Sequence, residues 1–179
     1  ATKKLTSFGL EVESKVFPGD ISDEAFKKEF AAINADASVD GILMLRPLPK
    51  QINEQDIEKM IDPAKDLDGI SPVNIAKVFS GDTSGFAPCT AEAVVCMLKM
   101  NDIALSGKRV AVVGRSMVVG RPLSMLLLHE NATVTICHSR TASLPEVCRE
   151  ADILTACVGK AAMINHTYVK KDAVVIDVG

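Results

Sequence analysis

Short, nearly continuous apolar runs alternate with amphipathic segments in the second half of the chain. The runs are typical of strands buried on both faces of a parallel sheet, and they cover residues 110–113, 132–137, 152–157 and 174–178. Between the first three of them, residues 122–130 and 144–150 place apolar side chains at helical spacing. Because short connections link strand, helix and strand, we expect a parallel sheet with right-handed crossovers.

The first half shows the same alternation less regularly. Two segments predict strands, residues 10–16 and 39–45, and the second is apolar almost throughout. Helices are expected over residues 23–34, 54–61, 72–79 and 91–100, with Thr90 as a candidate N-cap for the last. We therefore predict an α/β protein of two α/β units with parallel sheets, joined near residues 99–105, with a cleft between the units.

Composition narrows the class of protein. The chain has 179 residues, a net charge of −3 and interspersed charges of both signs, so it offers no basic surface for nucleic acid or an anionic membrane. No apolar run reaches the roughly 18 residues of a membrane-spanning helix. The start lacks the apolar stretch of a signal peptide. The five cysteines include no C-x-x-C pair, so we expect reduced, packed thiols in a cytoplasmic protein and no metal site.

The turn after the first strand of the second unit is the most informative segment. The strand delivers Gly114 into a turn, and a helix is expected to start at Pro122, which suits a first helical position. Such a turn directs backbone N–H groups at a phosphate. It departs from G-x-G-x-x-G, because Ser116 stands at the second glycine position and Gly120 comes one place after the third. The motif alone is also compatible with a glycine-rich turn that binds nothing.

The residues after the next strand bear on the choice of dinucleotide. A protein that binds NAD normally places an acid there to accept from the ribose 2′-hydroxyl. Here Ser139, Arg140 and Thr141 follow, without an acid, and Arg115 in the first turn adds a second cation. Hydroxyl and guanidinium groups suit a 2′-phosphate, so the sequence favours NADP over NAD. The neighbouring His138 could contact adenine or support the loop.

Four stretches together resemble one enzyme family. They are 39–49 (VDGILMLRPLP), 65–69 (KDLDG), 85–90 (GFAPCT), and 114–122 (GRSMVVGRP) leading to 137–141 (CHSRT). In this order they resemble the bifunctional methylenetetrahydrofolate dehydrogenase/cyclohydrolase family, and the resemblance spans essentially all residues. It implies a folate-binding catalytic domain over 1–98, a Rossmann-type NADP-binding domain over 99–179, and a homodimer. Because the chain ends on a strand, we also expect the second domain to be incomplete at its C-terminal end. The resemblance implies that the first domain is incomplete at its N-terminal end.

The resemblance also implies roles for individual residues. Asp68 matches the folate-binding Asp and is the predicted catalytic residue. The predicted substrate-binding residues are Met44, Leu45, Arg46, Asp68 and Pro88. The predicted cofactor-binding residues are Thr90, Gly114, Arg115, Ser116, Gly120, Ser139, Arg140, Thr141 and Gly159. Two alternatives come from the residues themselves: Asp66 and Asp68 could cap the turn before Gly69, and Arg46 could form a surface salt bridge instead of reaching the cleft.

Two departures from the family pattern concern the hydrolytic step. The family activates water with a Lys held by a Gln. Ungapped counting from Gly9 puts Ala1 at the Lys position, with Lys3 two places late, and the typical Val-Gln-Leu-Pro-Leu-Pro run puts Leu45 at the Gln position and Arg46 at the following Leu. Leu45 cannot hydrogen-bond a Lys.

Dehydrogenation depends less on the missing Lys and Gln, because direct hydride transfer depends mainly on positioning two ligands. We therefore predict an oxidoreductase of one-carbon metabolism that oxidises 5,10-methylenetetrahydrofolate to 5,10-methenyltetrahydrofolate with NADP, its cyclohydrolase step lost or weak. The alternatives are a bifunctional enzyme that also forms 10-formyltetrahydrofolate, and a non-catalytic nucleotide-binding relic.

Overall fold

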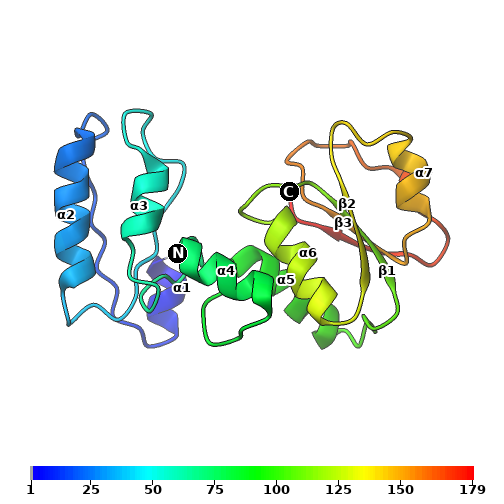
Figure 1. The fold of residues 1–179 in the computed structure, drawn as a ribbon, viewed down its shortest axis with the longest axis horizontal. Coiled ribbons are helices and arrows are strands. Elements are labelled where there is room, and N and C mark those ends of the chain that lie inside the picture. Colours follow the sequence, from blue (N-terminus) through cyan, green and yellow to red (C-terminus); the bar gives the residue numbers. More distant parts are fainter. Residues whose placement is uncertain (1) are drawn as a thin grey trace.

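A four-stranded parallel sheet organises the second half of the molecule. The structure is a computed structural model that describes residues 2–179 (Figure 1). The strands are β1 (Arg109–Val113), β2 (Thr133–Cys137), β3 (Ile153–Ala156) and β4 (Val174–Asp177), in the order β2-β1-β3-β4. The chain adds β2 on one side of β1 and then adds β3 and β4 on the other side. The direction in which successive strands are added therefore reverses between β1 and β3. In open α/β sheets, ligands bind outside the carboxyl ends of the strands at such a reversal.

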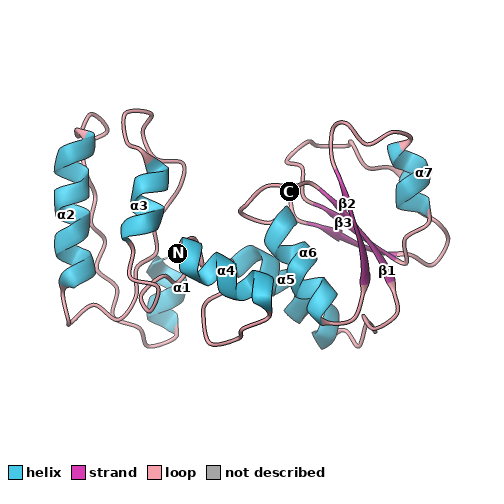
Figure 2. Cartoon of the chain, viewed as in Figure 1, coloured by secondary structure: helices cyan, strands magenta, loops and turns pink. Residues whose placement is uncertain are grey.

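Helices cover both faces of this sheet (Figure 2). Val110 and Val112 of β1 share a core with α5 (Cys89–Met100) and α6 (Gly120–His129). The alternate residues, Ala111 and Val113, share the opposite core with α7 (Leu144–Arg149). Burial on both faces explains why the strand is apolar from Val110 to Val113. The predicted α/β class with a parallel sheet is confirmed.

The first half is mainly helical. It contains α1 (Thr2–Ser7), α2 (Asp23–Ala35), α3 (Glu54–Met60) and α4 (Pro72–Ser80), and a short 3₁₀ helix, η1 (His166–Tyr168), lies in the second half. Ser22 caps α2 by accepting a hydrogen bond from Ala25 N at 3.2 Å. Phe26 and Phe30 stack at 6.2 Å in a core that α2 shares with α3. Figure 1 places α4 and α5 between this core and the sheet.

The two strands predicted in the first unit are not regular strands within residues 2–179. The segment 39–45 contributes one parallel bridge, Ile42 to Asp66, in which Ile42 N donates to Lys65 O at 2.6 Å. The segment 10–16 is extended, and Val16 is 89% exposed. A strand requires a neighbour to complete its ladder, and the described part of the first unit supplies only this single bridge.

Two predicted helix starts are also wrong. Helix α5 begins at Cys89 with Pro88 at the cap position, so Thr90 lies inside the first turn instead of capping it. Helix α6 begins at Gly120, which makes Pro122 its third residue. Proline is tolerated there because the first-turn N–H groups have no partner within the helix.

The position of α5 bears on how the chain is divided. Its buried residues, among them Ala91 and Leu98, pack in the same core as β1 and α6. The helix therefore packs with the sheet, whereas the predicted division at 98/99 assigns most of it to the first unit. No helix in the described part of the chain is long and apolar enough to cross a membrane.

Candidate functional site

Asp66 and Asp68 have different roles although they lie in one loop. Asp66 is fully buried, and its carboxylate accepts hydrogen bonds from Ile70 N at 3.0 Å, Ser71 N at 2.8 Å and Asn74 Nδ2 at 2.9 Å. These bonds fix the loop against the first turn of α4. The turn-capping alternative is therefore correct for Asp66.

Asp68 is free of this turn and partly exposed. Its side chain is 25% exposed, and Oδ2 accepts from Arg46 Nη2 at 3.2 Å. Lys65 is not its partner, because the Lys65 ammonium donates to Asn34 O and Asp36 O at 2.9 and 2.7 Å. Asp68 is thus available to a ligand from a fixed loop.

Arg46 lies among three carboxylates. Besides Asp68, its Nη1 is 3.4 Å from Glu54 Oε1 and 3.8 Å from Glu58 Oε1, and the Arg46 side chain is only 17% exposed. Burial and the neighbouring Glu54 raise the pKa of the Glu58 carboxyl, against the opposing effect of Arg46. Arg46 therefore reaches Asp68 instead of forming a salt bridge at the open surface.

Glu54 and Glu58 belong to this cluster, although no role was expected for them from the sequence. The available signal was their i, i+4 spacing on a predicted helix, which places both carboxylates on one face.

The other two predicted substrate-binding residues of this segment differ in exposure. Met44 is 8% exposed and packs in the core of the first unit with Phe26 and Ile57. Leu45 is 74% exposed. Ala1, expected at the catalytic Lys position, lies outside the described residues, and Lys3 is exposed on α1. The arrangement brings together Arg46 and Asp68, whereas Met44 belongs to the core.

A backbone contact joins the Asp68 loop to the start of α5. Gly69 has φ +61°, and a Cβ there would lie 2.6 Å from Pro88 N and from the carbonyl carbon of Ala87. The Cys89 thiol donates to Leu67 O at 3.0 Å. Partial burial and the nearby Asp68 raise the pKa of the Cys89 thiol. Pro88 therefore lies against Gly69, the residue that follows Asp68.

The turn after β1 is held by two glycines. At Gly114, φ is +133° and a Cβ would lie 2.4 Å from Cys157 O after β3; at Gly120, a Cβ would lie 2.2 Å from Gly114 O. Gly120 therefore serves the close helix-to-strand packing that the third glycine serves in G-x-G-x-x-G. Ser116 accepts from Val119 N at 3.1 Å and thereby orders the turn. Arg115 and Ser116 are exposed at its tip.

The loop after β2 is braced by its own side chains. His138 N donates to Thr141 Oγ1 at 2.9 Å, and Arg140 N donates to His138 Nδ1 at 3.1 Å. The His138 ring thus supports the loop, which is one of the two roles that the sequence left open for it. Ser139 and Arg140 are exposed at the tip, where an anion could reach both.

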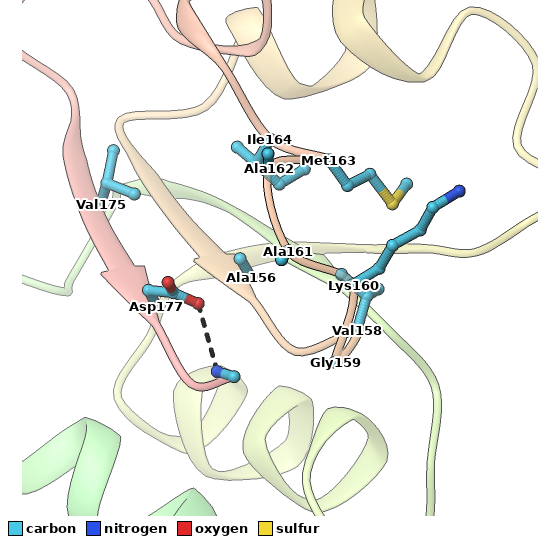
Figure 3. A pocket seen from close by; sticks show the side chains of 11 residues that line it. Ala156, Val158, Gly159, Lys160, Ala161, Ala162, Met163, Ile164, Val175 and Asp177 are labelled. Carbon is cyan, nitrogen blue, oxygen red and sulfur yellow. Dashed lines mark hydrogen bonds between the residues drawn. The ribbon is translucent and has the colours of Figure 1, made fainter.

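The last predicted cofactor residue, Gly159, lies at the carboxyl ends of β3 and β4. Gly159 has φ +55°, its N–H donates to Gly179 O at 2.7 Å, and it lines a pocket of about 450 Å³ with Ala156 and Asp177 (Figure 3). Gly179 N in turn donates to Asp177 Oδ1 at 3.1 Å.

A second pocket is lined by residues of both units. It has a volume of about 500 Å³ and is lined by Glu58, Ile70, Met117 and residues of α4. Ile70 follows Asp68 by two residues, and Met117 follows Gly114 by three. The loop of Asp68 and the turn of Gly114 therefore approach each other across α4.

Comparison with known proteins shows what these two parts have in common. Residues 1–68 match the catalytic domain of tetrahydrofolate dehydrogenase/cyclohydrolase, and residues 88–179 match the NAD(P)-binding domain of the same family. The chain belongs to the tetrahydrofolate dehydrogenase/cyclohydrolase family. The family resemblance seen in the sequence is thereby confirmed.

Close relatives carry the name bifunctional protein FolD. The protein of Clostridium kluyveri is 51% identical over 177 residues, which cover 99% of this chain and 62% of that protein. The Carboxydothermus hydrogenoformans protein is 52% identical over 179 residues, covering 100% of this chain and 62% of its own length. The chain thus spans about 62% of the length of these family members.

Solved structures of the family share the fold. The bifunctional FolD of Campylobacter jejuni has a TM-score of 0.97 at 34% identity, over 99% of this chain and 63% of that one. The FolD of Trypanosoma brucei, solved with NADP and an inhibitor, has a TM-score of 0.93 at 32% identity, over 99% and 61%.

Proposed function

We propose that this chain forms the folate-binding loop and the dinucleotide-binding sheet of a bifunctional methylenetetrahydrofolate dehydrogenase/cyclohydrolase that uses NADP. The observation that carries the proposal is the pocket lined by Ile70 and Met117, since it brings the loop of Asp68 and the turn of Gly114 to one place. Family membership supplies the reaction class, and the name of the relatives supports both activities.

In the oxidation, this chain binds and orients. Asp68, held by Arg46, accepts hydrogen bonds from N–H groups of the folate ring, and Pro88 at the start of α5 borders the same space. NADP, when bound, accepts the hydride from the folate methylene. Gly114 and Gly120 keep the turn close enough for its N–H groups to meet the pyrophosphate, with Arg115 and Ser116 in the same turn. Thr90, in the first turn of α5, is assigned to the nicotinamide end of the cofactor by the family resemblance. Direct hydride transfer requires no general base, so the rate depends mainly on how the folate and NADP are positioned.

Formation of NADPH from 5,10-methylenetetrahydrofolate and NADP by the purified protein tests the dehydrogenase proposal. Asp68→Asn is expected to lower kcat/KM for the folate by about 100-fold, because it removes a charged acceptor at the substrate. Asp62→Asn, a change in the preceding turn, is the matched control and is expected to retain activity. Absence of NADPH formation by the wild type would overturn the proposal.

The preference for NADP rests on the loop after β2. Ser139, Arg140 and Thr141 form a braced turn without an acid, which suits a 2′-phosphate. Arg140→Ala is expected to raise KM for NADP by about 10-fold and to leave KM for NAD unchanged, because only NADP carries the phosphate. Equal effects on the two KM values would contradict this assignment.

The hydrolytic step is the second candidate activity. The relatives' name favours the bifunctional alternative over the loss of hydrolysis predicted from Leu45. We infer that hydrolysis by this protein does not depend on a hydrogen bond from the side chain at position 45. Disappearance of methenyltetrahydrofolate above the uncatalysed rate tests the activity, and Lys3→Met tests the Lys that lies nearest to the expected place. Loss at the uncatalysed rate would restore the dehydrogenase-only prediction.

Three further expectations stay predictions. A homodimer follows from the family resemblance and is tested by light scattering of the purified protein. The cytoplasmic location is tested by cell fractionation. The division into units 1–98 and 99–179 is tested by limited proteolysis, which should cut first near 99–105 if the boundary lies there.

A further inference from the structure

Arg46 is a departure from the family pattern at the substrate site. The typical run places a Leu at this position, and here a guanidinium stands 3.2 Å from Asp68, 3.4 Å from Glu54 and 3.8 Å from Glu58. Its side chain is 17% exposed, whereas the three carboxylate side chains are 25–34% exposed. Arg46 and the three carboxylates are therefore largely shielded from water. Charge-assisted hydrogen bonds are stronger in such surroundings, because the local dielectric constant is lower.

The charge balance decides which role Arg46 can take. One guanidinium among three carboxylates leaves a local charge of about −2 when all are ionised. A site with this balance repels the carboxylates of a folate, so Arg46 does not bind the substrate as an anion receptor. Its donors are already directed at protein oxygens.

The same contacts fix the position of Asp68. Arg46 Nη2 bonds only one oxygen of this carboxylate, Oδ2, and its Nη1 is held by Glu54 and Glu58 of α3. The guanidinium thus connects the substrate loop to a helix in the core of the first unit. Asp68 Oδ1 can then accept hydrogen bonds from a ligand in a fixed direction.

We propose that Arg46 is a positioning residue of the dehydrogenase, which orients the Asp68 carboxylate for the folate by tying it to Glu54 and Glu58. This inference rests on the proposed function of the Asp68 loop. Since orientation of a bound ligand determines hydride transfer, the contribution of Arg46 is expected in folate binding and not in cofactor binding.

Three variants of the purified protein test the inference. Arg46→Leu restores the residue type of the family run, and Arg46→Lys retains a charge but cannot bridge in a planar fork. Lys27→Met is the matched control, because the Lys27 ammonium also joins carboxylates, Asp23 at 2.6 Å and Asp56 at 2.7 Å, away from Asp68. The measurements are KM for methylenetetrahydrofolate, KM for NADP, Kd for tetrahydrofolate by calorimetry, and Tm.

Arg46→Leu is expected to raise KM and Kd for the folate by about 10-fold and to leave KM for NADP within about twofold. Arg46→Lys is expected to recover part of the folate affinity. Lys27→Met should lower Tm without changing either KM. Should Arg46→Leu fail to fold, the comparison of Arg46→Lys with the wild type decides.

Other results would overturn the inference. If Arg46→Leu or Arg46→Lys lowers Tm but leaves KM and Kd for the folate unchanged, Arg46 is structural only. If Arg46→Leu weakens folate and NADP equally, the cluster does not act through Asp68. A wild type that binds tetrahydrofolate but forms no NADPH would contradict the proposed dehydrogenase while leaving the binding test of Arg46 intact, and one that binds no tetrahydrofolate would overturn both.

Discussion

Replacement of Asp66 by Ala should destabilise the protein strongly although the residue touches no ligand. Asp66 is fully buried and accepts from two backbone N–H groups, Ile70 at 3.0 Å and Ser71 at 2.8 Å, and from the Asn74 amide. The other N–H of the Asn74 amide donates to Pro63 O at 3.0 Å, so the substitution leaves three N–H groups without their acceptor, those of Ile70 and Ser71 and one from Asn74. Each buried unsatisfied donor costs about 1–3 kcal/mol, and removal of one partner from a buried charged network costs about 3–5 kcal/mol. We expect a loss of about 3–5 kcal/mol.

Urea unfolding of the purified protein measures this loss. At about 2–4 °C per kcal/mol for a domain of this size, the same change lowers Tm by about 6–20 °C. Asp62→Ala is the matched control, because Asp62 accepts from Ala64 N at 2.9 Å in an exposed turn and should cost less than about 1 kcal/mol. A loss below about 1 kcal/mol for Asp66→Ala, with an unchanged m value, would refute the assignment of Asp66 to the frame of the loop.

Three further changes probe the site. Because partial burial and Asp68 raise the pKa of Cys89, iodoacetamide should label this thiol slowly at pH 8, and Asp68→Asn should accelerate the labelling, as followed by peptide mass spectrometry. Burial and a neighbouring carboxylate raise the pKa of Glu58 above 4.5, so its ionisation opposes folding at higher pH; Glu58→Gln should raise Tm at pH 7, and the gain should vanish as the pH falls to about 4.5. Gly120→Ala would put a Cβ 2.2 Å from Gly114 O and should weaken NADP binding about 10-fold or more by calorimetry.

Each of these has a result that contradicts it. Cys96, which is also exposed, is the internal control for alkylation, and labelling of Cys89 that is unaffected by Asp68→Asn would show that the two groups do not interact. A Tm difference for Glu58→Gln that is constant from pH 4.5 to 7 would come from packing and not from charge. Unchanged NADP affinity in Gly120→Ala would mean that the turn can open without cost.

The sheet could be predicted from sequence because its signal is local. The four residues of β1 from Val110 to Val113 are each buried against one of two helical layers, so the chain must be apolar at these positions. The predicted strand over 39–45 has the same apolar character, but a ladder also needs a neighbour. Only the bridge from Ile42 to Asp66 is present among the described residues, and an apolar run does not contain that information.

The same limit applies to the two acids of the substrate loop. Asp66 and Asp68 are equally good turn residues, and sequence spacing cannot say which carboxylate turns inward. The choice depends on the path of the backbone after Gly69, which brings Ser71 N and Asn74 to Asp66. The cysteines were expected to be packed thiols. Cys137 and Cys148 are packed in the core as predicted, whereas Cys89 and Cys96 are exposed.

Backbone contacts explain how this chain departs from the family pattern at its site and still keeps the fold. Gly69, Gly114 and Gly120 each approach a neighbouring backbone more closely than a Cβ would allow, and these contacts place both loops. The departures at Leu45 and Arg46 lie outside these contacts and do not form them. These side chains can therefore change while the backbone is kept. The backbone superposes on the Campylobacter jejuni enzyme with a TM-score of 0.97 although the sequence identity is 34%. Under the proposed function, the differences between this protein and its relatives are therefore expected in substrate affinity and in the hydrolytic step, and not in the backbone frame of the two loops.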